Sequence, residues 1–169
     1  MIKVEIGRIE EQNADVIVNS TNSEMLWEDT TVNGWIHKKA GKEYTIHCLN
    51  YIKEKGLLKT NDIVITPSFN MNCKYIFNVY TPYWQSKLTK YELYQNLFFT
   101  YNKIFDEFRK TKLKTIVFPL LSSGTFLYPI DLALACALDS FELNKDILSK
   151  LILYDKHTYN MYENLINKL

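Results

Sequence analysis

The pattern of hydrophobic and polar positions along the chain changes repeatedly between two periods. Short apolar runs rich in β-branched and aromatic residues predict strands, whereas apolar residues spaced three and four apart predict helices. We expect strands near residues 2–6, 15–18, 62–66, 74–80, 115–118 and 150–154, and helices near 32–40, 43–55, 89–110, 130–143 and 161–169. Because strands and helices alternate in this order, the pattern predicts a three-layer α/β/α fold.

The first predicted helix has one apolar face. Val32, Trp35, Ile36 and Ala40 lie on that face at helical spacing. Asp29 or Thr30 is the expected N-cap, because short polar side chains before a helix accept hydrogen bonds from its first N–H groups.

Length, composition and charge narrow the class of protein. A chain of 169 residues fits one domain spanning 1–169, and 47% hydrophobic residues can supply a sizeable core. The formal net charge of +1 argues against an electrostatic nucleic-acid or membrane partner. No apolar run reaches the ~18 residues that span a bilayer, and no signal peptide is visible. We therefore expect a cytoplasmic protein with no nucleic-acid and no membrane partner.

The three cysteines, Cys48, Cys73 and Cys136, are widely spaced and form no C-x-x-C pair. We interpret them as reduced thiols of an intracellular protein. His47 precedes Cys48, but no second cluster of cysteine and histidine accompanies this pair. We therefore expect no metal and no cofactor.

One stretch, residues 115–129, combines a strand, a loop of small residues and a helix start. The apolar run 116–118 stops at Pro119, and a Ser-Ser-Gly-Thr segment follows before Pro129 opens the next helix. Such a connection at the carboxyl end of a strand can form an anion site from backbone N–H groups. The alternative is a plain strand-to-helix connection, because the segment matches no known phosphate-binding fingerprint.

Three candidate segments follow the carboxyl ends of predicted strands. Asn22 follows the second strand, the loop 122–126 follows the fifth, and Tyr154 ends the last. Ligands of open α/β sheets bind outside the carboxyl ends of the strands. We therefore expect these segments to meet in one crevice.

Two ordered stretches resemble signatures of the macrodomain family, an ADP-ribose-binding α/β fold. Residues 15–22 are similar to the family's I-V-N-A-A-N segment, and residues 32–41 to its V-D-x-A-I-H-x-x-A-G segment. Residues 119–129 are similar to its P-x-I/L-S-S/T-G-I/V/T-F/Y-x-x-P segment. Weaker matches at 61–66, 75–82 and 151–155 extend the resemblance over about the full length. The resemblance implies a macrodomain with a central sheet that is mixed and mostly parallel.

For the diphosphate of ADP-ribose, the resemblance implies a backbone nest. Ser122, Ser123, Gly124 and Thr125 would wrap the two phosphates with N–H groups, so that no lysine is needed. Val32, at the start of the first helix, belongs to the same set of implied ligand-binding residues.

For the base and the distal ribose, the resemblance implies side-chain contacts. Tyr154 would stack on the adenine, and Ile9 would cover its opposite face. Asn22 would hydrogen-bond the distal ribose, since its amide offers both a donor and an acceptor. Phe126 would pack on that ribose, with a core position as the alternative. Asn19 is expected to be a turn residue that bonds its own backbone.

The sequence departs from the family pattern at three places. Arg8 stands where the family carries an aspartate that accepts from the adenine amino group, and an arginine has donors only. We expect either that stacking alone holds the adenine or that Arg8 binds a phosphate or carboxylate. Residues 27–31 replace a glycine-rich loop and bring Glu28 and Asp29. Asn33 replaces the aspartate of many hydrolytic members, and an asparagine cannot act as a general base at neutral pH.

These features leave two functions open. The first is a module that binds ADP-ribose, an ADP-ribose derivative or an ADP-ribosylated protein without turning it over, which the lost glycines, Arg8 and Asn33 favour. The second is a hydrolase of ADP-ribosyl bonds or of O-acetyl-ADP-ribose in which Asn22 positions a water, with Asn33 as the second candidate catalytic residue. An RNA-binding function is disfavoured, because the chain has no basic stripe.

Overall fold

The computed structural model describes residues 2–167. Its six strands are β1 (Lys3–Ile6), β2 (Val16–Thr21), β3 (Ile63–Pro67), β4 (Tyr75–Tyr80), β5 (Thr115–Pro119) and β6 (Leu148–Leu153). They form one sheet in the order β1-β6-β5-β2-β4-β3, in which β3 runs antiparallel to β4 and every other neighbouring pair is parallel. The predicted mixed, mostly parallel sheet is confirmed.

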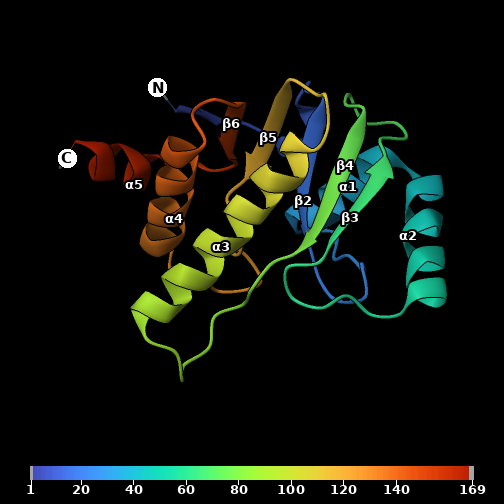
Figure 1. Ribbon diagram of the computed structural model, residues 1–169, viewed down its shortest axis with the longest axis horizontal. Helices are drawn as coiled ribbons and strands as arrows, with labels where there is room; N and C mark the ends of the chain where they lie inside the picture. Colours follow the sequence, from blue (N-terminus) through green and yellow to red (C-terminus); the bar gives the residue numbers. More distant parts are fainter. Residues whose placement is uncertain (1, 168–169) are drawn as a thin grey trace.

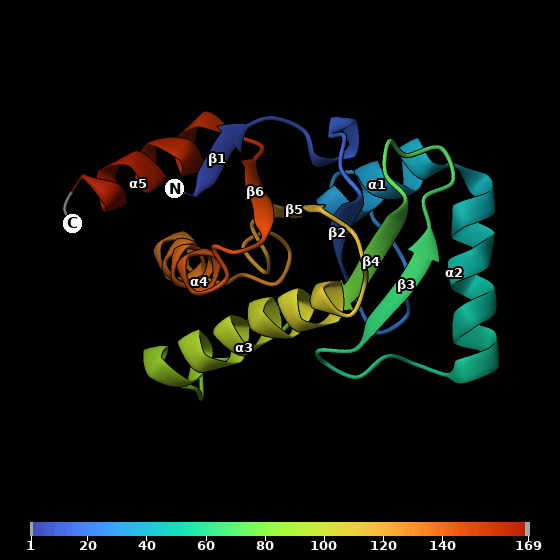
Figure 2. The ribbon, with the colours of Figure 1, turned by 45° about the horizontal axis from the view of Figure 1, so that its top comes forward.

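Helices cover both faces of the sheet (Figures 1 and 2). The helical elements are a short 3₁₀ turn η1 (Ile9–Glu11) and the α-helices α1 (Val32–Ala40), α2 (Lys42–Lys55), α3 (Lys90–Arg109), α4 (Ile130–Leu143) and α5 (Lys156–Ile166). One hydrophobic core joins α1 and α2 to one face, and a second joins α3, α4 and α5 to the other. The three-layer α/β/α prediction is therefore confirmed. Leu169, expected on the apolar side of the last helix, lies outside the described residues.

The central strands explain why the short apolar runs form this sheet. In β2, Val16 and Val18 face the core beneath α3 and α4, whereas Ile17 faces the core beneath α1 and α2, and all three are fully buried. A parallel strand covered on both faces needs apolar residues at successive positions, which produces a continuous run rather than an alternation. Within the described residues, no helix is both long and apolar enough to cross a membrane.

Two local predictions were wrong. β2 does not end before Asn19 but continues to Thr21, because the Asn19 amide is buried and donates to Asn33, Tyr44 and Asn78 on neighbouring elements instead of bonding its own backbone. The N-cap of α1 is Thr31, whose Oγ1 accepts from the N–H of the third helical residue at 3.1 Å. The N-cap therefore lies one or two residues later than expected, whereas the helix itself covers the predicted range 32–40.

The topology brings separate loops to one end of the sheet. β1, β6, β5 and β2 are consecutive parallel neighbours, so their carboxyl ends lie at the same edge. Residues 22–31 leave β2, residues 120–129 leave β5, and Tyr154 follows β6 directly. The fold thus positions three loops around one crevice.

Candidate functional site

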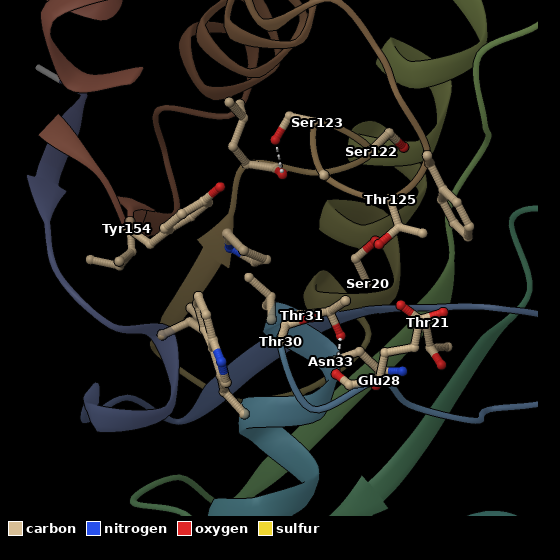
Figure 3. Close-up of a pocket in the computed structure, with 18 of the residues that line it drawn as sticks. Ser20, Thr21, Glu28, Thr30, Thr31, Asn33, Ser122, Ser123, Thr125 and Tyr154 are labelled. Atoms are coloured by element: carbon tan, nitrogen blue, oxygen red, sulfur yellow. Dashed lines mark hydrogen bonds between the residues drawn. The ribbon is translucent and has the colours of Figure 1, made fainter. Parts of the chain in front are cut away.

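A pocket of about 320 Å³ occupies this crevice. Figure 3 shows Tyr154 at one end of it and Ser20, Thr21 and Glu28 at the other, with Ser123 and Thr30 on opposite sides between them. The pocket is elongated, and its walls come from the loop after β5 and from the start of α1. An elongated ligand with chemically different ends fits this shape.

The loop after β5 forms one wall and is held from behind. Ser122 adopts a left-handed backbone conformation with φ of 63°, and its buried Oγ donates to the carbonyl of Pro82 at 2.6 Å. The carbonyl of Ser122 accepts from Tyr128 N at 3.0 Å, and that of Gly124 accepts from Leu127 N at 2.9 Å. A positive φ costs free energy in a non-glycine residue and persists only where the surroundings impose it, as these hydrogen bonds do here.

The same loop presents a row of unused donors. Within the described part of the chain, the backbone N–H groups of residues 122–126 donate no hydrogen bond to other protein groups. All five residues line the pocket. Consecutive N–H groups in such a turn can form a nest for an anion.

The start of α1 forms the opposite wall. Val32 and Asn33, its first two residues, line the pocket, and their backbone N–H groups have no partner within the helix. The positive end of the helix dipole points to the same place. Both walls therefore offer N–H donors and partial positive charge.

The side chain of Asn22 stabilises the loop between β2 and α1 by hydrogen bonds to the backbone of that loop. Asn22 Oδ1 accepts from the N–H groups of Glu24 and Leu26, each at 3.1 Å, and its Nδ2 donates to the Leu26 carbonyl at 3.0 Å. Asn22 lines the pocket, but most of its hydrogen-bonding capacity already stabilises the loop.

Asn33 is the second anchor of this loop. Its Nδ2 donates to the Leu26 carbonyl at 2.6 Å, and its Oδ1 accepts from Asn19 Nδ2 at 2.8 Å. Asn19 Nδ2 also approaches Tyr44 and Asn78, and burial raises the pKa of the Tyr44 hydroxyl well above its usual value. Asn33 thus connects the pocket wall to a buried polar network.

A glycine sets how closely this loop approaches α1. An added Cβ at Gly34 would lie 2.0 Å from the carbonyl oxygen of Glu28 and 3.0 Å from Cα of Asp29. The position therefore requires glycine because of this close backbone approach. Glu28 lines the pocket, whereas Asp29 does not.

The far end of the pocket is rich in hydroxyl groups. Ser20 Oγ and Thr81 Oγ1 lie 2.8 Å apart, and the buried Oγ1 of Thr21 has no partner within the described residues. Phe126 closes this end and packs near Tyr80, with ring centroids 6.1 Å apart. A polyhydroxylated group such as a sugar suits these surroundings.

The near end of the pocket is aromatic. Tyr154 and Trp35 line it, with ring centroids 5.5 Å apart and an interplanar angle of 74°, and Ile9 lies beside them. Arg8 does not line the pocket. Its guanidinium lies 4.6 Å from the centroid of the Trp35 ring, and its Nε donates to Glu10 Oε1 at 2.6 Å.

The pocket thus brings together most of the residues singled out in the sequence. Its wall contains the predicted residues Ile9, Asn22, Val32, Asn33, Ser122, Ser123, Gly124, Thr125, Phe126 and Tyr154. Arg8 lies outside it, where its guanidinium pairs with the carboxylate of Glu10. Trp35 and Thr21 were missed. Trp35 lies on the same face of α1 as Val32, and α1 follows the loop that leaves the carboxyl end of β2. Because Val32 was assigned to the site, its neighbour on this face could have been assigned to it as well.

Few titratable groups face the pocket. Among the described residues that line it, only Glu28 and Tyr154 carry one. His37 lies behind the wall, between the rings of Trp27 and Tyr44, and burial lowers its pKa to about 4. The imidazole is therefore neutral near pH 7 and does not face the ligand space.

Comparison with known proteins points to one family. The family model of the Macro domain matches residues 18–137. A macro domain-containing protein of Caldanaerobacter subterraneus subsp. tengcongensis is 30% identical over 174 residues, which covers 99% of this chain and 97% of the relative. A protein of Pantoea vagans named O-acetyl-ADP-ribose deacetylase 1 is 29% identical over 172 residues, which covers 95% of each chain. An Oceanobacillus iheyensis macrodomain mutant solved with ADPR superposes with a TM-score of 0.85 at 28% identity, covering 98% of this chain and 91% of that one.

Proposed function

Because this chain belongs to the macrodomain family, we propose that it binds ADP-ribose or an ADP-ribose derivative in the pocket at the carboxyl ends of β2, β5 and β6. The observation that carries the proposal is the row of five backbone N–H groups without protein acceptors, residues 122–126, in a loop that lines the same pocket as the start of α1. A diphosphate carries two negative charges and many acceptor oxygens, which match donors on both walls.

The two ends of the pocket suit the two ends of this ligand. The adenine belongs at the aromatic end, between Tyr154 and Ile9. The distal ribose belongs at the hydroxyl-rich end, near Thr21, Asn22 and Phe126. The hydroxyl of Ser20 and the remaining amide N–H of Asn22 at this end can hydrogen-bond ribose hydroxyls, which supports this orientation.

Binding without turnover fits the chemistry of the pocket better than hydrolysis. Asn22 and Asn33 both spend their amides on the carbonyl of Leu26 and on other protein groups. Neither side chain can accept a proton at neutral pH. We therefore assign both residues to shaping the pocket wall in a binding module.

Hydrolysis is the second candidate, because one relative is named a deacetylase of O-acetyl-ADP-ribose. In that function, Asn22 would use its remaining N–H to orient a water, and Glu28 is the carboxylate in the pocket that could take its proton. A hydrolysis assay with O-acetyl-ADP-ribose and with mono-ADP-ribosylated protein separates the two functions. Turnover that disappears in Asn22→Ala would establish the enzyme instead of the binding module.

Glu28 also bears on which derivative binds best. No salt bridge within the described residues neutralises its carboxylate, and it lies at the distal end near Thr21 (Figure 3). This charge opposes a bare diphosphate but favours a ligand with a cationic or donor group on the distal ribose. We therefore infer that some such derivative binds at least about tenfold tighter than ADP-ribose, a difference of about 1.4 kcal/mol.

The test of the site is calorimetric titration with ADP-ribose. Gly124 does not have a positive φ, and no atom lies within 4 Å of an added Cβ, so we expect its substitution to leave the fold intact. Gly124→Glu places a carboxylate among the N–H donors and should abolish binding, whereas Gly124→Ala tests the effect of a methyl group alone. Unchanged affinity in Gly124→Glu would overturn the site assignment.

Partners and location follow from the same proposal. A protein that carries ADP-ribose is a further ligand, since the distal end of the pocket is exposed around Glu28. The three cysteines are free thiols, which fits a reducing compartment and supports a cytoplasmic location. Pull-down of mono-ADP-ribosylated proteins by the wild type, but not by Gly124→Glu, would test the partner.

A further inference from the structure

We propose that Trp35 is a base-contacting residue, and that this end of the pocket recognises a purine by stacking rather than by the substituent at its 6-position. The inference rests on the proposed function, because it assigns the base of that ligand to the aromatic end. Trp35 is half-buried, lines the pocket and lies edge-on to Tyr154, with ring centroids 5.5 Å apart. The two rings are in edge-to-face contact, and both line the pocket, where a flat purine can stack on an aromatic face.

The Trp35 ring is held from outside the pocket. The guanidinium of Arg8 lies 4.6 Å from the ring centroid, within the range of a cation–π contact. Arg8 itself does not line the pocket, so its contact with the indole supports a ring that does. It is a positioning residue, because it acts on the base through Trp35.

Arg8 is in turn fixed by a buried carboxylate. Its Nε and one terminal nitrogen both contact Glu10 Oε1, and Glu10 is 6% exposed. The chain Glu10, Arg8, Trp35 thus runs from the core to the pocket. It explains why an arginine occupies this turn although it makes no contact with the ligand space.

The ion pair between Arg8 and Glu10 keeps the Glu10 carboxylate away from the end of the pocket assigned to the adenine. The only carboxylate lining the pocket within the described residues is that of Glu28, which lies at the opposite end from Tyr154 (Figure 3). An adenine amino group therefore finds no ionised acceptor side chain at the aromatic end. Stacking depends on the ring system, which adenine and hypoxanthine share, and tolerates different bases.

The first test compares tryptophan variants by titration with ADP-ribose. Trp35→Ala should weaken binding about 5- to 100-fold, the range expected for loss of one base-stacking partner, and Trp35→Phe should recover part of the loss. Trp27→Phe is the matched control, because Trp27 stacks on His37 and does not line the pocket. The fluorescence change on adding ADP-ribose should persist in Trp27→Phe and be lost in Trp35→Phe.

The second test compares ligands and the support of the ring. Inosine diphosphate ribose should bind the wild type within about threefold of ADP-ribose, since a charge-assisted hydrogen bond to the amino group would produce more than about tenfold. Arg8→Ala should weaken both ligands equally, and Arg8→Lys, which keeps a cation at the ring, should recover part of the loss.

The outcomes separate the inference from the function it rests on. A wild type that binds no ADP-ribose would overturn the proposed function. A wild type that binds ADP-ribose, with equal affinity in Trp35→Ala, would overturn the role of Trp35 and leave the site assignment intact. A preference for adenine above about tenfold would overturn recognition by stacking.

Discussion

Replacing Gly34 by alanine should damage the ligand pocket while leaving the helix that carries the residue intact. The new Cβ would lie 2.0 Å from the carbonyl oxygen of Glu28, and such contacts essentially never fall below 3.0 Å, so this carbonyl must retreat by about 1 Å. The same oxygen accepts hydrogen bonds from Thr31 N at 3.0 Å and from Thr31 Oγ1 at 2.7 Å. Both bonds weaken when the oxygen moves.

The stability and the affinity should respond differently. Alanine favours a helix over glycine by about 1 kcal/mol, and two weakened hydrogen bonds cost about 0.5–1.5 kcal/mol each. The free energy of unfolding should therefore fall by no more than about 2 kcal/mol. Because Glu28, Thr30 and Thr31 line the pocket, the moved loop changes the shape of its wall, and the loss of one or two ligand hydrogen bonds should weaken ADP-ribose binding by about 10- to 100-fold.

Calorimetric titration with ADP-ribose and chemical denaturation together measure both effects. Gly56→Ala is the control for stability alone, because Gly56 ends α2 with φ of 88°, has open space around it and lies away from the pocket. It should lower the free energy of unfolding by about 1 kcal/mol without changing affinity. If Gly34→Ala binds as tightly as the wild type, the close approach of the loop does not shape the site.

Three further changes test separate parts of the structure. Glu28→Gln removes the carboxylate from the pocket and should tighten ADP-ribose binding about three- to tenfold, with a smaller effect at high salt. Asp29→Asn should not change the affinity, because Asp29 does not line the pocket. Equal effects of the two substitutions in titration would refute the different roles of these carboxylates. Asn33→Asp replaces the donor to the Leu26 carbonyl by an oxygen and should cost about 1–3 kcal/mol in denaturant unfolding; unchanged stability would contradict the anchoring role. Because burial lowers the pKa of His37 to about 4 from an unfolded value of 6.5, its contribution to stability is complete above pH 6.5 and is lost as the pH falls toward 4, by about 3 kcal/mol. The pH dependence of unfolding should be shallower in His37→Phe, and an identical profile would count against a buried neutral imidazole.

The order of apolar runs was enough to predict the layers and the place of the pocket. β2 and β5 are hydrophobic at successive positions because both of their faces are covered, and the sequence shows this without any knowledge of the partners. Residues after parallel strands meet at one edge of the sheet. The loop 122–126 and Tyr154 could therefore be assigned to one crevice before their contacts were known.

The sequence alone did not determine the side-chain partners within that crevice. Helical spacing shows that Val32 and Trp35 share a face of α1, but not whether this face meets the core or a pocket, and Trp35 lies in the pocket wall. Arg8 could have bound a ligand anion, but the 3₁₀ turn that follows places the carboxylate of Glu10 within 2.6 Å of its Nε. Asn19 has the residue type of a turn, yet it continues β2 because Asn33, Tyr44 and Asn78 supply buried partners from three other elements.

Local pattern and tertiary contact therefore decided different properties of this protein. The spacing of apolar residues shows which positions of a segment are buried. This spacing is a property of each segment by itself, and it determines strands, helices and layers. The direction of a polar or aromatic side chain depends on which partner lies within about 3–4 Å, and that partner belongs to another segment brought close only by folding. For this reason the sequence could place the loop 122–126 at the crevice, whereas the Glu10–Arg8–Trp35 chain and the need for glycine at position 34 emerged only from the tertiary structure.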